Sequence, residues 1–154
     1  MIDDLYSAKI LTLVANMPRA GRLPAPDASS EKVAKLCGSK ITVDVVVGED
    51  GKVVDFAQDV SACALGQASA AILGQSVVGA DLSEIELARE SLIAMLKSNG
   101  SPPAGRFAEL AVLEPVKDYP ARHASTLLAF EATVEAVRKA TGAAETRTST
   151  AGAA

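Results

Sequence analysis

The sequence predicts an α+β fold in which helices pack on a small antiparallel sheet. The strongest signal is a hairpin. Apolar and polar residues alternate over 40–47 and again over 52–60, on either side of a Gly-Glu-Asp-Gly turn at 48–51. One face of this hairpin is mostly apolar and must be buried against other elements. The second signal is that apolar residues in most other segments recur at helical spacing, so helices cover that face.

The segment before the hairpin reads as a helix followed by a connection. Residues 2–17 carry an apolar helical face, and Pro18 ends it. Residues 18–36 are rich in Pro and Gly, which is typical of an irregular segment, and they leave room for a third strand before Cys37.

The segment after the hairpin is helical throughout. Residues 63–77 form an Ala-rich helix, and a second helix opens at a capping-box pair, Ser83 and Glu86. A short helix is expected at 106–112. The last helix runs from near Pro120, a favoured first-turn residue, to about residue 140. The second helix is expected to bury Ile85, Ala88, Leu92, Met95 and Leu96.

Length and patterning predict one domain over residues 1–140 and a disordered tail over 141–154, which lacks apolar periodicity. The chain has 19 acidic and 15 scattered basic residues, so no nucleic-acid surface is expected. The N-terminus lacks the pattern of a secretory signal, and polar residues interrupt the most apolar run, so no membrane association is expected. A cytoplasmic location follows, in which the two cysteines are thiols or metal ligands rather than a structural disulfide.

Three residues of a kind that binds metals stand at the ends of predicted elements. Cys37 precedes the hairpin, Cys63 opens the next helix, and His123 lies in the first turn of the last helix, facing the sheet. The hairpin register returns position 37 beside position 62 or 63. Cys/Cys/His suits zinc or iron. The alternatives are that each cysteine is a small buried hydrophobe, and that His123 is a buried histidine satisfied by a backbone carbonyl.

Other signals for chemistry are weak. Phosphate-loop, dinucleotide, zinc-protease and serine-hydrolase motifs are all missing from the sequence, so the chain is expected not to be an enzyme. Asp44, Asp55 and Asp59 fall on the polar face of the hairpin, which usually means solvated surface. Arg122 beside His123 is a further candidate that could attract an anion or a carboxylate of a partner.

Over residues 2–140 the chain resembles the NifU/IscU-type iron–sulfur cluster assembly scaffolds, and within them the SufU branch. The resemblance rests on the order and spacing of several pieces: Cys37-Gly38 before the first hairpin strand, the hairpin into Cys63, the small-residue helix CALGQASAAI and the YPAR entry to the last helix. It implies that Cys37 and Cys63 are two of the ligands that hold a cluster or zinc.

The chain departs from that family at two ligand positions. The family has an aspartate two residues after the first cysteine, where this chain has Ser39. It has a third cysteine in the last helix, and that position falls on Ala124 if one residue is missing between Arg122 and His123. His123 then takes the place of the family's histidine. A conventional three-cysteine cluster is therefore in question, and the Leu-Pro-Pro-Val-Lys motif of the IscU branch is absent.

The leading prediction is a scaffold or carrier that binds a labile iron–sulfur cluster or iron through Cys37, Cys63 and His123, with Ser39 and Arg122 as further site residues. The resemblance implies a cysteine desulfurase and apo iron–sulfur proteins as partners. A monomer or weak homodimer is expected. Two alternatives stay open: a degenerate, zinc-stabilised interaction protein, and a thiol carrier of sulfur.

Overall fold

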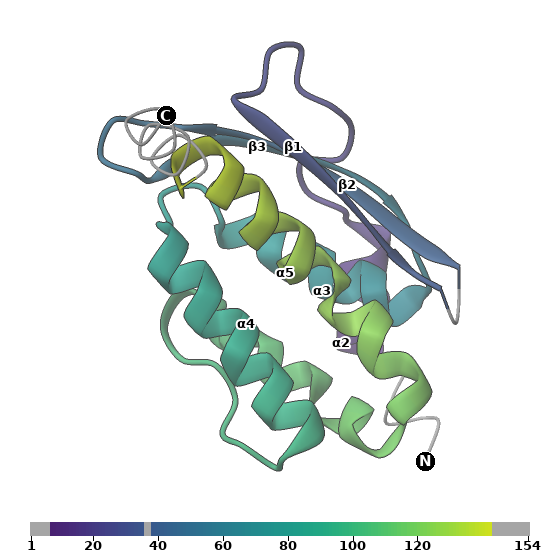
Figure 1. The fold of residues 1–154 in the computed structure, drawn as a ribbon. Helices are drawn as coiled ribbons and strands as arrows, with labels where there is room; N and C mark the ends of the chain where they lie inside the picture. The colour runs from purple at the N-terminus through teal and green to yellow at the C-terminus, as the bar shows by residue number, and fades with distance from the viewer. Residues whose placement is uncertain (1–6, 36–37, 143–154) are drawn as a thin grey trace.

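The computed structural model describes residues 7–35 and 38–142 (Figure 1). Its sheet has three antiparallel strands, β1 (Ala28–Ala34), β2 (Ser39–Val47) and β3 (Val53–Ser61), in the order β1-β2-β3. The predicted α+β fold class is confirmed, and so is the third strand. The observed strands β2 and β3 match the predicted hairpin closely, because strict alternation on a half-buried sheet is the clearest pattern that a sequence offers.

Helical segments and the loops that connect them make up the rest of the described chain. The termini differ in detail from the prediction. Residues 2–6 of the predicted first helix and residues 143–154 of the predicted tail lie outside the described residues, whereas Thr141 and Gly142 still belong to a helical turn. The segments are α2 (Ala8–Ala15), α3 (Ala64–Ser76), α4 (Leu82–Lys97), the 3₁₀ segments η1 (Gly105–Asp118) and η2 (Pro120–Arg122), α5 (His123–Val137) and the π-helical turn η3 (Arg138–Gly142).

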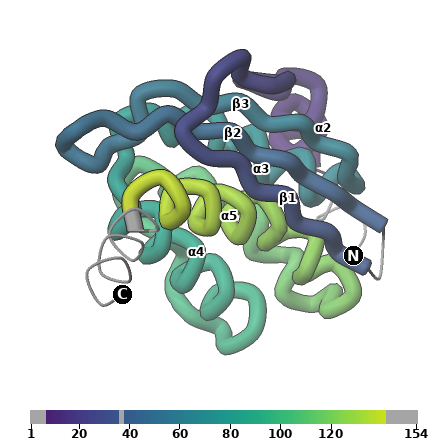
Figure 2. Tube along the Cα trace, turned by 45° about the horizontal axis from the view of Figure 1, so that its top comes forward, coloured from purple at the N-terminus to yellow at the C-terminus, as the bar shows by residue number. Residues whose placement is uncertain are grey.

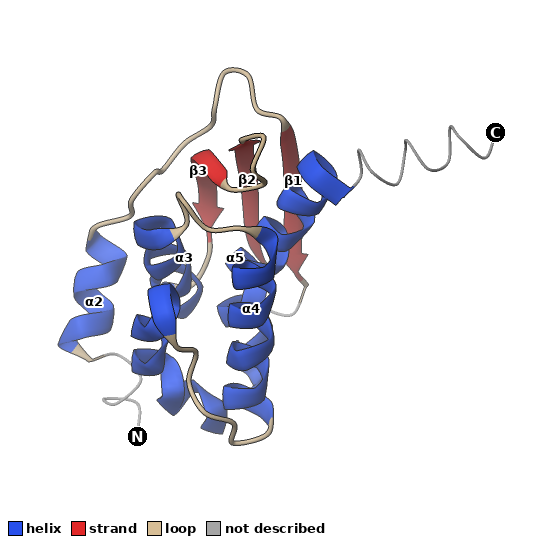
Figure 3. Cartoon of the chain, turned by 90° about the vertical axis from the view of Figure 1, so that its left-hand side faces the viewer, coloured by secondary structure: helices blue, strands red, loops and turns tan. Residues whose placement is uncertain are grey.

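The helices lie in layers on one face of the sheet (Figures 1 and 2). Helix α5 contacts β1 and β2, and α3 contacts β3 beside it. Helix α4 packs on the other side of α5, and α2 packs on α3, as Figure 3 shows from a second side. Because α5 is enclosed between the sheet and α4, it is buried on nearly every side. Within the described residues, none of these helices has the length and apolar character needed to cross a membrane.

Helix α4 begins earlier than the sequence analysis predicted. The capping box is formed by Asp81, which accepts the backbone N–H of Glu84 at 2.9 Å, and not by Ser83 and Glu86. Both pairs satisfy the three-residue spacing, and the Asp81–Glu84 pair is the one that makes reciprocal bonds, since the Glu84 carboxylate accepts the Asp81 N–H at 3.4 Å. The predicted inward residues of α4 are confirmed: Ile85, Ala88, Leu92, Met95 and Leu96 are its buried residues.

The outer face of the sheet is partly covered by the connection between α2 and β1. Arg22 on that connection binds Asp44 on β2, with Nε 2.6 Å and Nη2 3.0 Å from the carboxylate oxygens. The Leu23 N–H donates to the same carboxylate at 3.0 Å, and the Ser29 hydroxyl donates to it as well. Asp44 is completely buried. The interpretation of Asp44 as solvated surface was therefore wrong, since a distant segment covers the polar face there.

These contacts stabilise the charged form of Asp44. The hydrogen bond from Arg22 is the largest cause, and the pKa of the carboxyl falls from 3.8 to about 2. A pKa that is lower in the folded chain stabilises the fold while the group is ionised. The contribution is thus complete above about pH 4 and is lost as the pH falls toward 2.

We expect Asp44→Asn to lower the free energy of unfolding by about 2 kcal/mol at neutral pH, because the charge-assisted bonds are lost. The difference from the unsubstituted chain should shrink as the pH falls from about 4 toward 2, because the Asp44 carboxylate of the folded chain becomes protonated over that range. Urea unfolding at several pH values measures this. Asp59→Asn, on the same strand pair but exposed, is the matched control and should change little.

Candidate metal-binding site

Cys63 occupies the junction between β3 and α3. It is the N-cap residue of α3, with extended backbone angles (φ −66°, ψ 169°), and its side chain makes no capping bond. The thiol is free and half-buried. The backbone N–H groups of the first turn have no partner within the helix itself. The predicted location of Cys63 at the start of the helix is confirmed.

Two serine hydroxyls surround Cys63 and link three elements. Ser39, the first residue of β2, accepts the Cys63 backbone N–H on its Oγ at 3.3 Å. Ser125, in the first turn of α5, has its Oγ 3.1 Å from the Cys63 sulfur and 3.1 Å from the Ser39 Oγ. Both serines are buried. The ends of β2, α3 and α5 therefore meet at the Cys63 thiol.

Gly66 on α3 permits this close approach. A Cβ at position 66 would lie 2.7 Å from the Ser125 Oγ and 3.1 Å from the Ser125 backbone oxygen. Both distances are shorter than normal contacts with a side-chain carbon. Only a glycine allows α5 to pack so closely against the first turn of α3, and this packing brings Ser125 to Cys63.

Cys37 lies outside the described residues, so its predicted pairing with position 62 or 63 is not observed directly. Its neighbours are described. Gly38 has φ +74°, a left-handed conformation that suits glycine, and its N–H donates to Ala34 O at 2.8 Å across the turn between β1 and β2. The β2–β3 register runs to Lys40 opposite Ser61. The start of β2 and the residue Cys63 thus lie at one end of the sheet.

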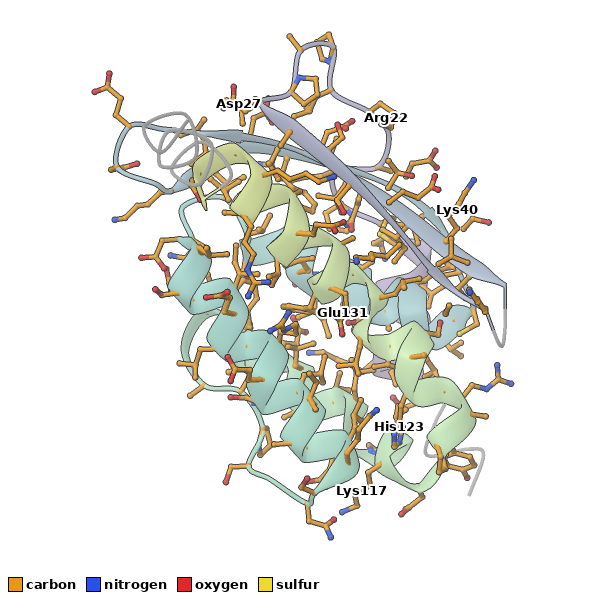
Figure 4. All side chains as sticks on the ribbon, in the orientation of Figure 1. Arg22, Asp27, Lys40, Lys117, His123 and Glu131 are labelled. Atoms are coloured by element: carbon orange, nitrogen blue, oxygen red, sulfur yellow. The ribbon has the colours of Figure 1, made fainter. Side chains whose placement is uncertain are left out.

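His123 is the first residue of α5 and is buried, but its ring faces η1 and not the sheet. Its Nε2 lies 3.0 Å from Val116 O and 3.2 Å from Lys117 O, so this nitrogen carries a proton and donates it. Figure 4 shows His123 beside Lys117 at the end of α5 remote from Asp27. The expectation that His123 faces the sheet was wrong, because the long 3₁₀ segment η1 folds back against the start of α5. Arg122, half-buried, precedes it in η2.

We expect His123→Leu to lower the free energy of unfolding by roughly 1–3 kcal/mol, because the buried carbonyl group of Val116 and the half-buried one of Lys117 lose their donor. His123→Gln keeps an N–H donor on a side chain of similar length and should lose distinctly less. Thermal or urea unfolding of the metal-free variants measures the difference. Equal stabilities of the two variants would show that these hydrogen bonds contribute little.

The described part of the site offers a metal one soft ligand, the Cys63 sulfur, and the two neutral hydroxyl groups of Ser39 and Ser125. A thiolate binds iron or zinc, whereas a serine hydroxyl is a weak ligand unless it is deprotonated. Within residues 7–35 and 38–142, no three Cys, His, Asp or Glu side chains gather closely enough to hold a metal ion, and Cys37 is not among those residues. The described part of the site therefore fits a metal only with ligands from elsewhere.

Comparison with known proteins identifies the family. The model of the family described as NifU-like N terminal domain matches residues 5–126. The chain belongs to the NifU-like N-terminal domain family. The N-terminal part of a nitrogen-fixing NifU-like protein from Brucella abortus has the same fold with 48% sequence identity and a TM-score of 0.88, over 90% of this chain and 96% of that one.

Two further proteins are similar to the chain, one in sequence and one in fold. The iron–sulfur cluster assembly scaffold protein IscU of Thermotoga maritima is 28% identical over 88% of this chain and 94% of its own length. A protein from Fervidobacterium islandicum, described as an iron–sulfur cluster assembly scaffold for the SUF system, shares the fold. It is 20% identical, with a TM-score of 0.79 over 88% of this chain and 98% of that one.

Ser125 was not predicted from the sequence as a site residue. Serine is common in helices, and neither its type nor its position in a mostly apolar segment marks it as a site residue. With a gap between Arg122 and His123, the position of the family's third cysteine falls on Ala124 and not on Ser125. The structure leaves Ala124 exposed, in a surface groove with Lys32 and Lys97 between β1, α4 and α5.

Proposed function

We propose that this chain is a scaffold or carrier in iron–sulfur cluster assembly, with iron or a labile cluster as its cargo and no catalytic activity of its own. The observation that carries the proposal is the contact between Cys63 and Ser39 at the meeting point of β2, α3 and α5. Ser39 is two residues after Cys37, so the cysteine that precedes β2 is close in the chain to a residue that touches Cys63. Membership of the NifU-like family and the name of the Thermotoga relative support the same function.

The proposed ligands are the thiolates of Cys37 and Cys63. His123 was the third predicted ligand, and it could serve only through Nδ1 unless Nε2 gives up its bonds to Val116 and Lys117. Ser39 and Ser125 stand beside the sulfur as hydroxyls. A site with two thiolates and few strong further ligands holds its cargo loosely, which is compatible with a protein that must pass the cargo on.

The proposed partners are a cysteine desulfurase, which supplies sulfur, and apo iron–sulfur proteins, which receive the cluster. Both require that the site be reached from outside. The half-buried thiol of Cys63 meets this requirement.

Anaerobic incubation with iron(II), a cysteine desulfurase, cysteine and dithiothreitol, which reduces the persulfide sulfur to sulfide, tests the proposal. We expect the chain to acquire iron and acid-labile sulfide with visible absorption, and to lose both when an apo iron–sulfur protein is added. A protein that stays colourless and iron-free under these conditions would rule out a scaffold function.

The paired hydroxyls favour one second candidate, a thiol carrier of sulfur. Here Cys63 would receive sulfur as a persulfide and pass it on without iron. The same incubation without iron and without the reductant, in which a persulfide survives, distinguishes the two functions. Persulfide on Cys63, found by mass spectrometry, together with no iron uptake when iron is present, would favour the carrier.

A further inference from the structure

The residue of α5 that faces the Cys63 sulfur is Ser125. Three contacts form a closed ring: the Cys63 N–H donates to Ser39 Oγ at 3.3 Å, Ser39 Oγ lies 3.1 Å from Ser125 Oγ, and Ser125 Oγ lies 3.1 Å from Cys63 Sγ. When the sulfur is a thiolate it can only accept. Each hydroxyl then donates to the next member, and Ser125 donates to the sulfur.

The neighbouring residue points elsewhere. Successive residues of an α-helix project about 100° apart, so Ala124 and Ser125 cannot both face Cys63. Ala124 is exposed, whereas Ser125 is completely buried. An alignment of the last helix without a gap is therefore the one that the geometry supports.

We propose that residue 125, and not residue 124, is the position on α5 from which a side chain reaches a metal bound at Cys63. Because residue 125 is a serine, the site lacks the third thiolate that the NifU/IscU-type pattern has in the last helix. This inference rests on the proposed function for its biological meaning, but its geometry can be tested independently. Because Ser125 is neutral, it orients the Cys63 sulfur by hydrogen bonding and does not add a strong ligand.

Disulfide trapping tests the geometry without any metal. Ser125→Cys and Ala124→Cys are each prepared with Cys37→Ser, so that Cys63 is the only natural thiol. On mild oxidation we expect Ser125→Cys to form an intramolecular disulfide with Cys63, while Ala124→Cys keeps two free thiols. Trapping by Ala124→Cys and not by Ser125→Cys would overturn the inference.

Relocating the thiol tests the role in metal binding. In a chain with Cys63→Ser, the additional change Ser125→Cys exchanges the thiol and the hydroxyl and keeps the combined volume of the pair, so the fold should be retained. We expect the exchange variant to bind cobalt(II) at least about tenfold more tightly than Cys63→Ser does. It should also restore the thiolate-to-cobalt absorption. Cys63→Ser with Ala124→Cys is the matched control and should recover neither.

The outcomes separate this inference from the proposed function. If the exchange variant recovers no more cobalt than its control, residue 125 does not face the metal, whatever the unsubstituted chain binds. If the exchange variant and Ser125→Cys bind cobalt but the unsubstituted chain takes up no iron or cluster, the inference stands and the proposed function fails. Melting curves of the metal-free variants verify that each is folded.

Discussion

Cys63→Ser is expected to reduce the affinity of the chain for iron or zinc by at least about 100-fold, since the loss of a ligand exceeds the 10–100-fold cost of removing an outer contact. The substitution is conservative for the fold. Serine is a favoured N-cap residue, and Cys63 is the N-cap of α3, so the metal-free protein should be as stable as before or slightly more stable. Metal competition with a chelator of known affinity measures the first effect, and thermal unfolding of the metal-free chain measures the second.

A linked result concerns stability with metal present. If metal binds only the folded chain, at about one hundred times its Kd it adds about 2.7 kcal/mol to the free energy of unfolding. A chelator should therefore lower the melting temperature of the unsubstituted chain and leave that of Cys63→Ser unchanged. Metal binding by Cys63→Ser with undiminished affinity would place the site elsewhere.

Gly66→Ala is expected to damage the fold and the site together. Its new Cβ would meet the Ser125 side chain at 2.7 Å and the Ser125 backbone oxygen at 3.1 Å, and the backbone of α5 cannot rotate aside as a side chain can. We expect a loss of about 3 kcal/mol in the free energy of unfolding, only partly offset by the better helix propensity of alanine. Because α5 is displaced from Cys63, metal affinity should fall as well.

Gly74→Ala is the matched control on the same helix. There the added Cβ would lie 2.8 Å from the Gln58 Nε2 and 3.1 Å from Pro18 O, which is similar crowding at the other end of α3. We expect a comparable loss of stability but an unchanged metal affinity at a temperature where both variants are folded. Equal effects of the two variants on metal affinity would show that the approach of Ser125 to Cys63 is not needed for binding.

The parts of the fold that could be predicted from the sequence are those set by local periodicity. Alternation located β2 and β3, and helical spacing identified every buried residue of α4. Where two local signals competed, as in the capping boxes of Asp81 and Ser83, the pattern alone could not choose between them. Both candidate caps have a glutamate three residues later.

The parts that could not be predicted depend on contacts between distant segments. Asp44 occupies a position that the alternation predicts to be exposed. Arg22 from another segment nevertheless covers it and, by its hydrogen bonds, lowers the pKa of the Asp44 carboxyl. His123 is a local exception: it continues an apolar stripe, yet its ring bonds to carbonyl groups only six and seven residues earlier, at the end of η1. Ser125 reaches Cys63 because Gly66 lets two helices approach, and no single segment of sequence encodes that approach.

The most direct measurement of the central claim is the content of iron, zinc and acid-labile sulfide in the protein purified anaerobically, compared with that of Cys63→Ser. For a scaffold whose site is centred on Cys63, we expect iron together with sulfide in the unsubstituted protein and neither in the variant. Zinc without sulfide would favour the interaction protein. The same metal content in both proteins, or none in either, would contradict the assignment of Cys63 as the centre of a cargo site.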